Sequence, residues 1–143
     1  AFTDHQPLTG ADIWILDLRT HTRRALARSW FDETWARFSP DGKWIAYMSN
    51  EGGRWQVYVQ SADGDGQRIR VSSEGGTWPS WSSDGATVFF SSADATMASA
   101  IRTAPRLAAA VPSIVRHDGS RGSAGLRAVL EWFSELAAHG GTS

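Results

Sequence analysis

The feature that most constrains this chain is a short turn motif that occurs twice. Ser39-Pro40-Asp41-Gly42 and Ser82-Ser83-Asp84-Gly85 each lie between two short apolar runs, and their aspartates are 43 residues apart. In such a turn proline presets φ at the first corner, aspartate tolerates the second, and glycine supplies the left-handed residue that aligns the two strands. The motif therefore predicts two β-hairpins, at residues 35–47 and 78–90.

The similarity between the two units extends to the strands around the turns. Apolar positions match at spacings of 43 or 44 residues: Ile13-Trp14-Ile15 with Val57-Tyr58-Val59, Phe38 with Trp81, Ile45 with Val88, and Tyr47 with Phe90. A repeated unit of about 40–45 residues with four strands is typical of the blades of a β-propeller. The sequence predicts an all-β fold: an incomplete β-propeller of about two four-stranded blades, followed by a short C-terminal helix. Six side chains are expected in its core: Ile45, Tyr47, Val57, Val59, Val88 and Phe90.

The repeat also divides the chain. Residues 1–92 are predicted to hold the blades: the outer half of one (about 12–28), a whole blade (about 35–72) and the inner half of a third (about 78–91), after an initial loop over 1–11. Residues 93–123 are predicted to be an irregular linker, because they are Ala-rich, lack strand alternation and contain Pro105 and Pro112. Residues 124–139 are predicted to form a helix or a terminal strand–helix segment, since apolar residues recur there at helical spacing.

Ring closure is the physical problem that this organisation raises. Propellers close with about 4–8 blades, whereas 143 residues accommodate at most about three units of this length. A blade buries its two faces against its neighbours, so an isolated stack leaves two apolar faces bare. Three solutions are open: a longer parent chain, self-association through the open blade faces, or marginal stability.

Composition and charge exclude several classes of function. The 14 basic and 15 acidic residues give a net charge of −1, which offers no electrostatic attraction for nucleic acid. No apolar run approaches the roughly 18 residues that indicate a membrane span, so no membrane insertion is expected. The absence of cysteine excludes disulfides, thiolate metal sites and a cysteine nucleophile, and it is compatible with either redox compartment.

Catalytic and metal-binding motifs are sparse. The Gly-x-Ser-x-Gly elbow is absent and no two histidines have metal-ligand spacing, so no catalytic residue is predicted. Asp63 and Asp65, in the turn Asp63-Gly64-Asp65-Gly66, are the best candidates for calcium ligands, although an EF-hand loop is lacking and a flexible turn is the alternative. The recurring Asp41 and Asp84 are expected to accept hydrogen bonds within their own turns. Glu33 and Glu74 precede the two inner strands. They are either a pair of carboxylates for acid–base chemistry or two solvated loop charges.

Aromatic and cationic side chains are the better candidates for binding. Tryptophan and arginine are the residue types that most often anchor protein interfaces. The candidate partner contacts are Trp30, Trp35, Arg54, Trp55 and Trp78. Packing between blades is the competing role for the tryptophans.

These motifs resemble a known family. Residues 38–50, 78–85 and 12–18 are similar to the WD40-like repeat of TolB-type β-propellers, and the resemblance covers about residues 11–92. The succession also resembles the C-terminal propellers of bacterial multidomain proteins, including propellers attached to serine/threonine kinases. The family pattern would continue with further strands and another turn after Ser92, which the sequence does not show.

Three functions follow from these observations, in order. The first is a non-enzymatic scaffold that presents loops to a protein or peptide partner, with no cofactor. The second is a hydrolase, perhaps calcium-assisted, that acts on a lactone, an ester or a glycoside. The third, implied by the resemblance, is the sensory propeller of a bacterial serine/threonine kinase.

Overall fold

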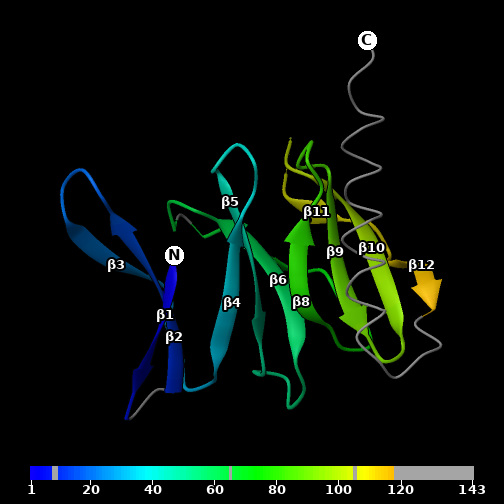
Figure 1. Cartoon of the computed structure of the whole chain (residues 1–143), viewed down its shortest axis with the longest axis horizontal. Helices are drawn as coiled ribbons and strands as arrows, with labels where there is room; N and C mark the ends of the chain where they lie inside the picture. Colours follow the sequence, from blue (N-terminus) through cyan, green and yellow to red (C-terminus); the bar gives the residue numbers. More distant parts are fainter. Residues whose placement is uncertain (8–9, 65, 105, 118–143) are drawn as a thin grey trace.

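The computed structural model describes residues 1–7, 10–64, 66–104 and 106–117, which form three antiparallel sheets (Figure 1). The first sheet has the order β1-β2-β3: β1 (Phe2–Gln6), β2 (Gly10–Asp17) and β3 (Thr22–Ala27). The second has the order β4-β5-β6-β7: β4 (Glu33–Phe38), β5 (Trp44–Ser49), β6 (Gln56–Ser61) and β7 (Arg68–Arg70). The third contains β8 (Thr77–Trp81), β9 (Thr87–Ser92), β10 (Ala95–Arg102), β11 (Ala108–Ala109) and β12 (Ser113–His117); β11 and β12 both pair with β10.

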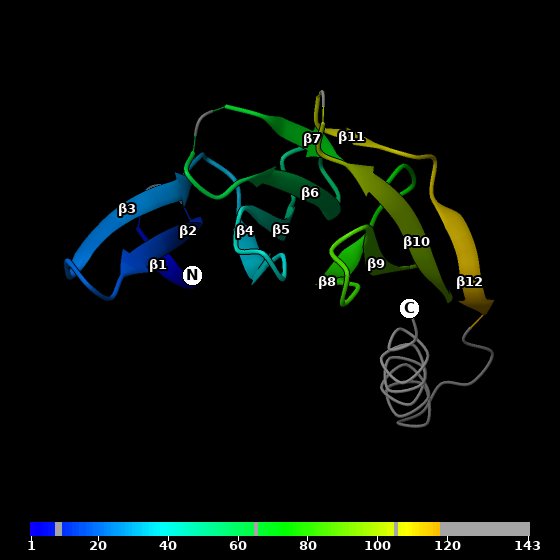
Figure 2. The same cartoon turned by 90° about the horizontal axis from the view of Figure 1, so that it is seen from above.

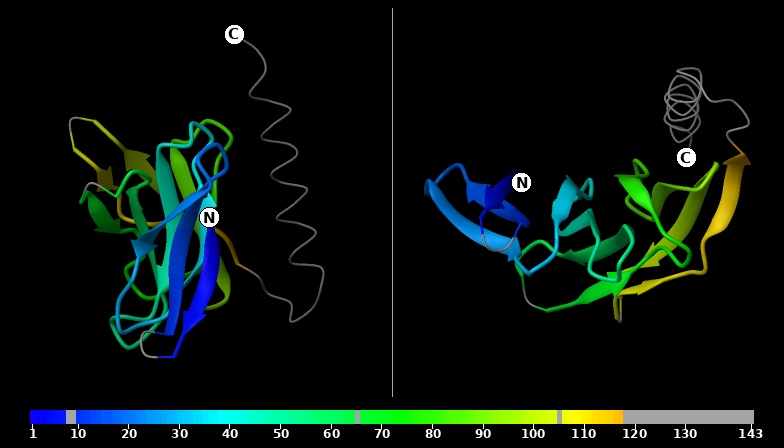
Figure 3. Two further views of the ribbon diagram at one scale, coloured as in Figure 1. Left: turned by 90° about the vertical axis from the view of Figure 1, so that its left-hand side faces the viewer. Right: turned by 90° about the horizontal axis from the view of Figure 1, so that it is seen from below.

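The three sheets stand side by side along an arc, as the blades of an open propeller do. Figure 2 shows β1, β4 and β8 on the concave side of the arc and β3, β7 and β11 on its convex side. The view from below in Figure 3 shows the same arc, with the start of the chain on the concave side. The all-β, incomplete-propeller fold is therefore confirmed, with three sheets in place of about two blades.

Both predicted turns form with the same backbone hydrogen bonds. The Ser39 N–H donates to the Trp44 carbonyl at 2.8 Å, and the Gly42 N–H donates to the Ser39 carbonyl at 2.9 Å. The equivalent bonds of Ser82 and Gly85 measure 2.9 and 3.0 Å. Gly42 and Gly85 have φ of 72° and 71°, the left-handed conformation that glycine adopts at no steric cost.

The hydrophobic core consists of two clusters, one on each side of the second sheet. Alternate side chains of a strand point to opposite faces, so β5 and β6 contribute to both clusters. One cluster joins the first and second sheets: Ile13, Leu26, Ile45, Tyr47, Tyr58 and Ala62. The other joins the second and third sheets: Ala46, Val57, Val59, Val71, Val88, Phe90, Ile101 and Leu107. All six predicted core residues are buried in these clusters, so each blade does depend on its neighbour.

Two predictions of irregular structure are wrong. The expected loop at 1–11 contains β1 and the start of β2, and the expected linker at 93–123 contains β10, β11 and β12. Two features hide the start of these strands in the sequence: most side chains of β10 are small, and the two-residue turn between β9 and β10 lacks glycine. Ala93 takes the left-handed conformation there, with φ of 49°. The helix or strand–helix segment predicted at 124–139 lies outside the described residues.

Candidate partner-binding site on the inner strands

Trp35 and Trp78 occupy equivalent positions on the two inner strands β4 and β8. The register of β4 against β5 shifts between Thr34 and Arg37, and that of β8 against β9 shifts between Thr77 and Ser80. Inside each irregularity the tryptophan has a positive φ, 58° for Trp35 and 56° for Trp78. A bulky side chain in this region is an outlier that costs about 1–2 kcal/mol. The same costly bulge is thus present in both blades.

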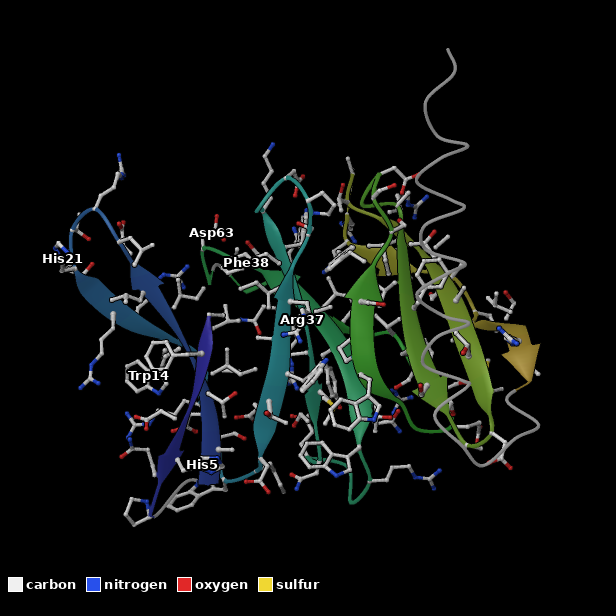
Figure 4. All side chains as sticks on the ribbon, viewed as in Figure 1. His5, Trp14, His21, Arg37, Phe38 and Asp63 are labelled. Carbon is white, nitrogen blue, oxygen red and sulfur yellow. The ribbon has the colours of Figure 1, made fainter. Side chains whose placement is uncertain are left out.

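The two bulges place the indole rings against each other in an edge-to-face contact. The ring centroids of Trp35 and Trp78 lie 4.4 Å apart with an interplanar angle of 88°. Trp35 and Trp78 are still 39% and 52% exposed, and Phe38 on β4 is 42% exposed. The Arg37 guanidinium carbon lies 4.5 Å from the centroid of the Trp35 ring (Figure 4 labels Arg37 and Phe38). We call Trp35, Arg37, Phe38 and Trp78 the inner aromatic cluster.

Hydrogen bonds between blades hold this cluster in place. The Trp78 N–H donates to the sulfur of buried Met48 at 3.3 Å. The Trp81 indole N–H donates to the Arg37 carbonyl at 3.0 Å. Backbone groups that leave the ladder at a bulge need other partners, and the neighbouring blade supplies them here. The cluster therefore depends on the packing of the second and third sheets.

The other predicted contact residues lie in loops. Trp30, in the β3–β4 connection, is 79% exposed. Arg54 and Trp55 immediately precede β6, where the Arg54 guanidinium donates to the Glu74 carbonyl at 3.5 Å. The Trp55 carbonyl accepts the Gly76 N–H at 2.9 Å. The structure thus brings Trp35 and Trp78 together and leaves these three in connections. Arg37 and Phe38 were missed as site residues, because Phe38 matched a repeat position and Arg37 has no counterpart in the second unit.

The acidic turn residues have the roles expected from their own turns. Asp41 Oδ1 accepts bonds from the Ser39 hydroxyl at 2.6 Å and the Lys43 N–H at 3.0 Å, and the Ser39 bond is the main cause that lowers the pKa of Asp41. Asp84 makes the equivalent bonds, at 2.5 and 2.9 Å. Asp63 accepts a hydrogen bond from Ser61. Asp65 lies outside the described residues, so the calcium site stays a prediction. No group of three or more His, Asp or Glu suited to a metal occurs in the part of the chain that the structure describes.

Glu33 and Glu74 lie in different environments. Glu33 begins β4 and is only 2% exposed, and burial raises the pKa of its carboxyl. Its Oε1 accepts a hydrogen bond from Ser29, and its Oε2 has no hydrogen-bond partner among the described residues. Glu74 is exposed in the connection before β8. A buried and an exposed carboxyl do not form the matched pair that the repeat suggested.

Comparison with known proteins agrees with this geometry. A family model described as the TolB β-propeller domain matches residues 5–110. The chain belongs to the TolB β-propeller family. A solved structure from Agrobacterium tumefaciens that carries the TolB name matches with a TM-score of 0.58 and 19% identity, over 78% of this chain and 44% of that one. At this identity the match shows the fold alone, and the TolB-type chain spans less than half the length of that relative. In the part of this chain that the structure describes, no helix is long and apolar enough to cross a membrane.

Proposed function

We propose that this TolB-type chain is a non-enzymatic module that binds a protein or an extended peptide through its inner aromatic cluster. The single observation behind the proposal is the exposed pair Trp35–Trp78, in which each tryptophan lies on a strained backbone with a positive φ. Strained conformations persist where the surrounding structure enforces them, and they concentrate at binding sites. The bulges cost stability while they leave two indole rings open to solvent.

The chemistry of the cluster suits a protein partner. Aromatic residues and arginine are enriched at the centres of interfaces, where each large ring buries about 150–250 Å². The edge-to-face contact and the stacked Arg37 restrain the rings before a partner arrives. A restrained contact loses less conformational entropy on binding. The TolB-type propeller fold is consistent with a scaffold of this kind.

The hydrolase and the kinase-sensor functions stay predictions from the sequence. The features that carry the present proposal are aromatic rings and a guanidinium, which bind rather than cleave.

A peptide-display selection on the full chain tests the proposal. Peptides that bind the chain are expected to lose at least about 30-fold in affinity to the double variant Trp35→Gly/Trp78→Gly, because even one hot-spot side chain contributes about 2 kcal/mol or more. Glycine accepts the positive φ, so the variant should remain folded, which circular dichroism checks. The control Trp30→Ala removes a more exposed tryptophan from outside the cluster. Peptides that bind the double variant as tightly as the wild type, or that lose affinity to the control instead, would refute the proposal.

A further inference from the structure

The outer strands of the blades, with the turns that lead into them, carry most of the positive charge of the chain. Residues 18–28, 62–70 and 102–116 cover β3, β7, β11 and most of β12, and they contain nine arginines against two aspartates. The rest of the sequence has five basic and thirteen acidic residues. The net charge of −1 therefore conceals a strong separation of charge. We call the nine arginines the outer arginine edge: Arg19, Arg23, Arg24, Arg28, Arg68, Arg70, Arg102, Arg106 and Arg116.

This edge is accessible and largely without counter-charges. All nine arginines are exposed, and Figure 2 shows β3, β7 and β11 on the convex side of the arc. Outer strands form the rim of a propeller whatever its number of blades, so packing between blades leaves this side open. Among the described residues only two of the nine form ion pairs, Arg28 with Asp12 at 3.9 Å and Arg68 with Glu51 at 2.8 Å. Like charges that are gathered on one surface repel each other, and an anionic partner would relieve this repulsion.

Three of these arginines converge on the seam between the first and second sheets. Arg70 lies opposite Tyr58, and Arg68, two residues earlier on β7, takes the same face of the strand. Tyr58 belongs to the core cluster that joins the first and second sheets, so this face is directed at the first sheet. Arg24 of β3 reaches the seam from the other side, where its guanidinium donates to the Ala62 carbonyl. The seam thus brings together cationic groups from two blades.

The structure holds Arg68 in place before any ligand arrives. Its Nε donates to the Tyr47 hydroxyl at 2.8 Å and its Nη2 donates to Glu51 at 2.8 Å. Its guanidinium carbon lies 4.1 Å from the centroid of the Tyr58 ring. These bonds use two of the five N–H groups of a guanidinium. A restrained donor loses less conformational entropy on binding, so Arg68 is suited to accept a further anionic group.

The composition of the edge selects the class of anion. Guanidinium groups bind both carboxylates and phosphates through paired hydrogen bonds. The three ranges contain no phenylalanine, tyrosine or tryptophan, so the edge lacks the aromatic platforms on which proteins stack bases. A long nucleic acid would also run past the acidic remainder of the chain. A short acidic peptide feels mainly the arginines within the screening length of about 8 Å at physiological salt.

We propose that the outer arginine edge binds an acidic segment of a partner protein. Carboxylates of that segment pair with Arg24, Arg68 and Arg70 at the seam, and the other arginines attract the segment at longer range. This inference does not depend on the function of the inner aromatic cluster, because that cluster lies on β4 and β8 at the concave side of the arc (Figure 2).

A peptide of alternating glutamate and serine, about twelve residues long and labelled at its N-terminus, is the probe. Its binding to the full chain is measured by fluorescence anisotropy at about 50 mM and about 200 mM salt, and the higher salt should weaken it. Arg70→Gln should bind at least about tenfold more weakly at the lower salt, because a hydrogen bond to a charged group is lost. Arg54→Gln is the matched control: it removes the same charge from an exposed connection outside the edge and should bind within about threefold of the wild type. Circular dichroism checks that both variants are folded.

Four results would overturn the proposal. They are no binding of the acidic peptide, equal binding of a lysine–serine peptide of the same length, equal losses for the two variants, or tighter binding of a single-stranded oligonucleotide of about twelve nucleotides. The last result would assign the edge to nucleic acid. The double variant Arg24→Gln/Arg70→Gln should bind more weakly than Arg70→Gln, and a double variant that binds as well as Arg70→Gln would contradict the convergence of both blades on one ligand.

Discussion

Gly76→Ala tests how tightly the second and third blades pack. Gly76 is buried just before β8, and its φ lies outside the left-handed region. A Cβ atom at this position would lie 2.8 Å from Ser72 Cβ, 2.9 Å from Phe90 Cδ2 and 3.0 Å from Val57 Cγ2. Carbon atoms in contact normally lie about 3.5–4.0 Å apart. The alanine methyl group would therefore overlap three side chains at once.

None of these side chains can move away easily. Ser72, Val57 and Phe90 are 2%, 0% and 3% exposed. The Ser72 hydroxyl is also tied at both ends, since it accepts the Val57 N–H at 2.9 Å and donates to Gln56. Phe90 belongs to the third sheet and Val57 to the second, so relief of the overlap means separation of the two blades.

Overpacking of this kind costs about 1–3 kcal/mol in the free energy of unfolding. For a chain of this size the melting temperature should fall by roughly 3–10 °C, which thermal unfolding followed by circular dichroism measures. Gly52→Ala is the matched control, because no atom lies within 4 Å of its added Cβ and its φ is also ordinary. The control should be neutral or stabilised by up to about 1 kcal/mol through the unfolded state. Equal melting temperatures for Gly76→Ala and the wild type would refute close packing between the second and third blades at Gly76.

Three further predictions concern single groups. Burial raises the pKa of Glu33, so the stability that its protonated carboxyl contributes is present below the ordinary pKa of 4.5 and is lost as the pH rises through the raised pKa. Glu33→Gln should therefore unfold at a higher urea concentration than the wild type at pH 7, and this difference should shrink toward pH 4.5. A difference that grows in acid would contradict this prediction. Ser39→Ala removes a hydroxyl that accepts the Trp44 N–H at 3.0 Å and bonds to Asp41; a loss of about 1–2 kcal/mol is expected from urea unfolding, and an unchanged midpoint would count against it. Burial raises the pKa of Tyr47 to about 12, so the free energy of unfolding that depends on its protonated hydroxyl should fall as the pH rises from 10 toward 12. The variant Tyr47→Phe should not show this fall. Ultraviolet titration measures the pKa directly, and ionisation of Tyr47 near pH 10 in the folded chain would contradict the prediction.

The candidate site was only partly predictable. Trp35 and Trp78 are candidates from the sequence because they recur at one position of the repeat. Their positive φ is not predictable from the sequence, since residues with a positive φ are usually glycine or asparagine. Trp30 and Trp55 are also tryptophans, and the residues next to them in the sequence do not indicate that they lie in connections between strands. Residue type suggests candidate contacts, and the packing of two blades decides which of them meet.

The sequence by itself determined the hairpins, the period of the repeat and the residues of the core. Each of these follows from short-range chemistry: the turn preferences of proline, aspartate and glycine, and the alternation of apolar side chains along a strand. Tertiary structure alone decided three other features: the strands after Ser92, the contact between Trp35 and Trp78, and the burial of Glu33. They arise where side chains of one sheet meet those of the next, and such contacts depend on the packing of blades far apart in the chain rather than on any local window of sequence.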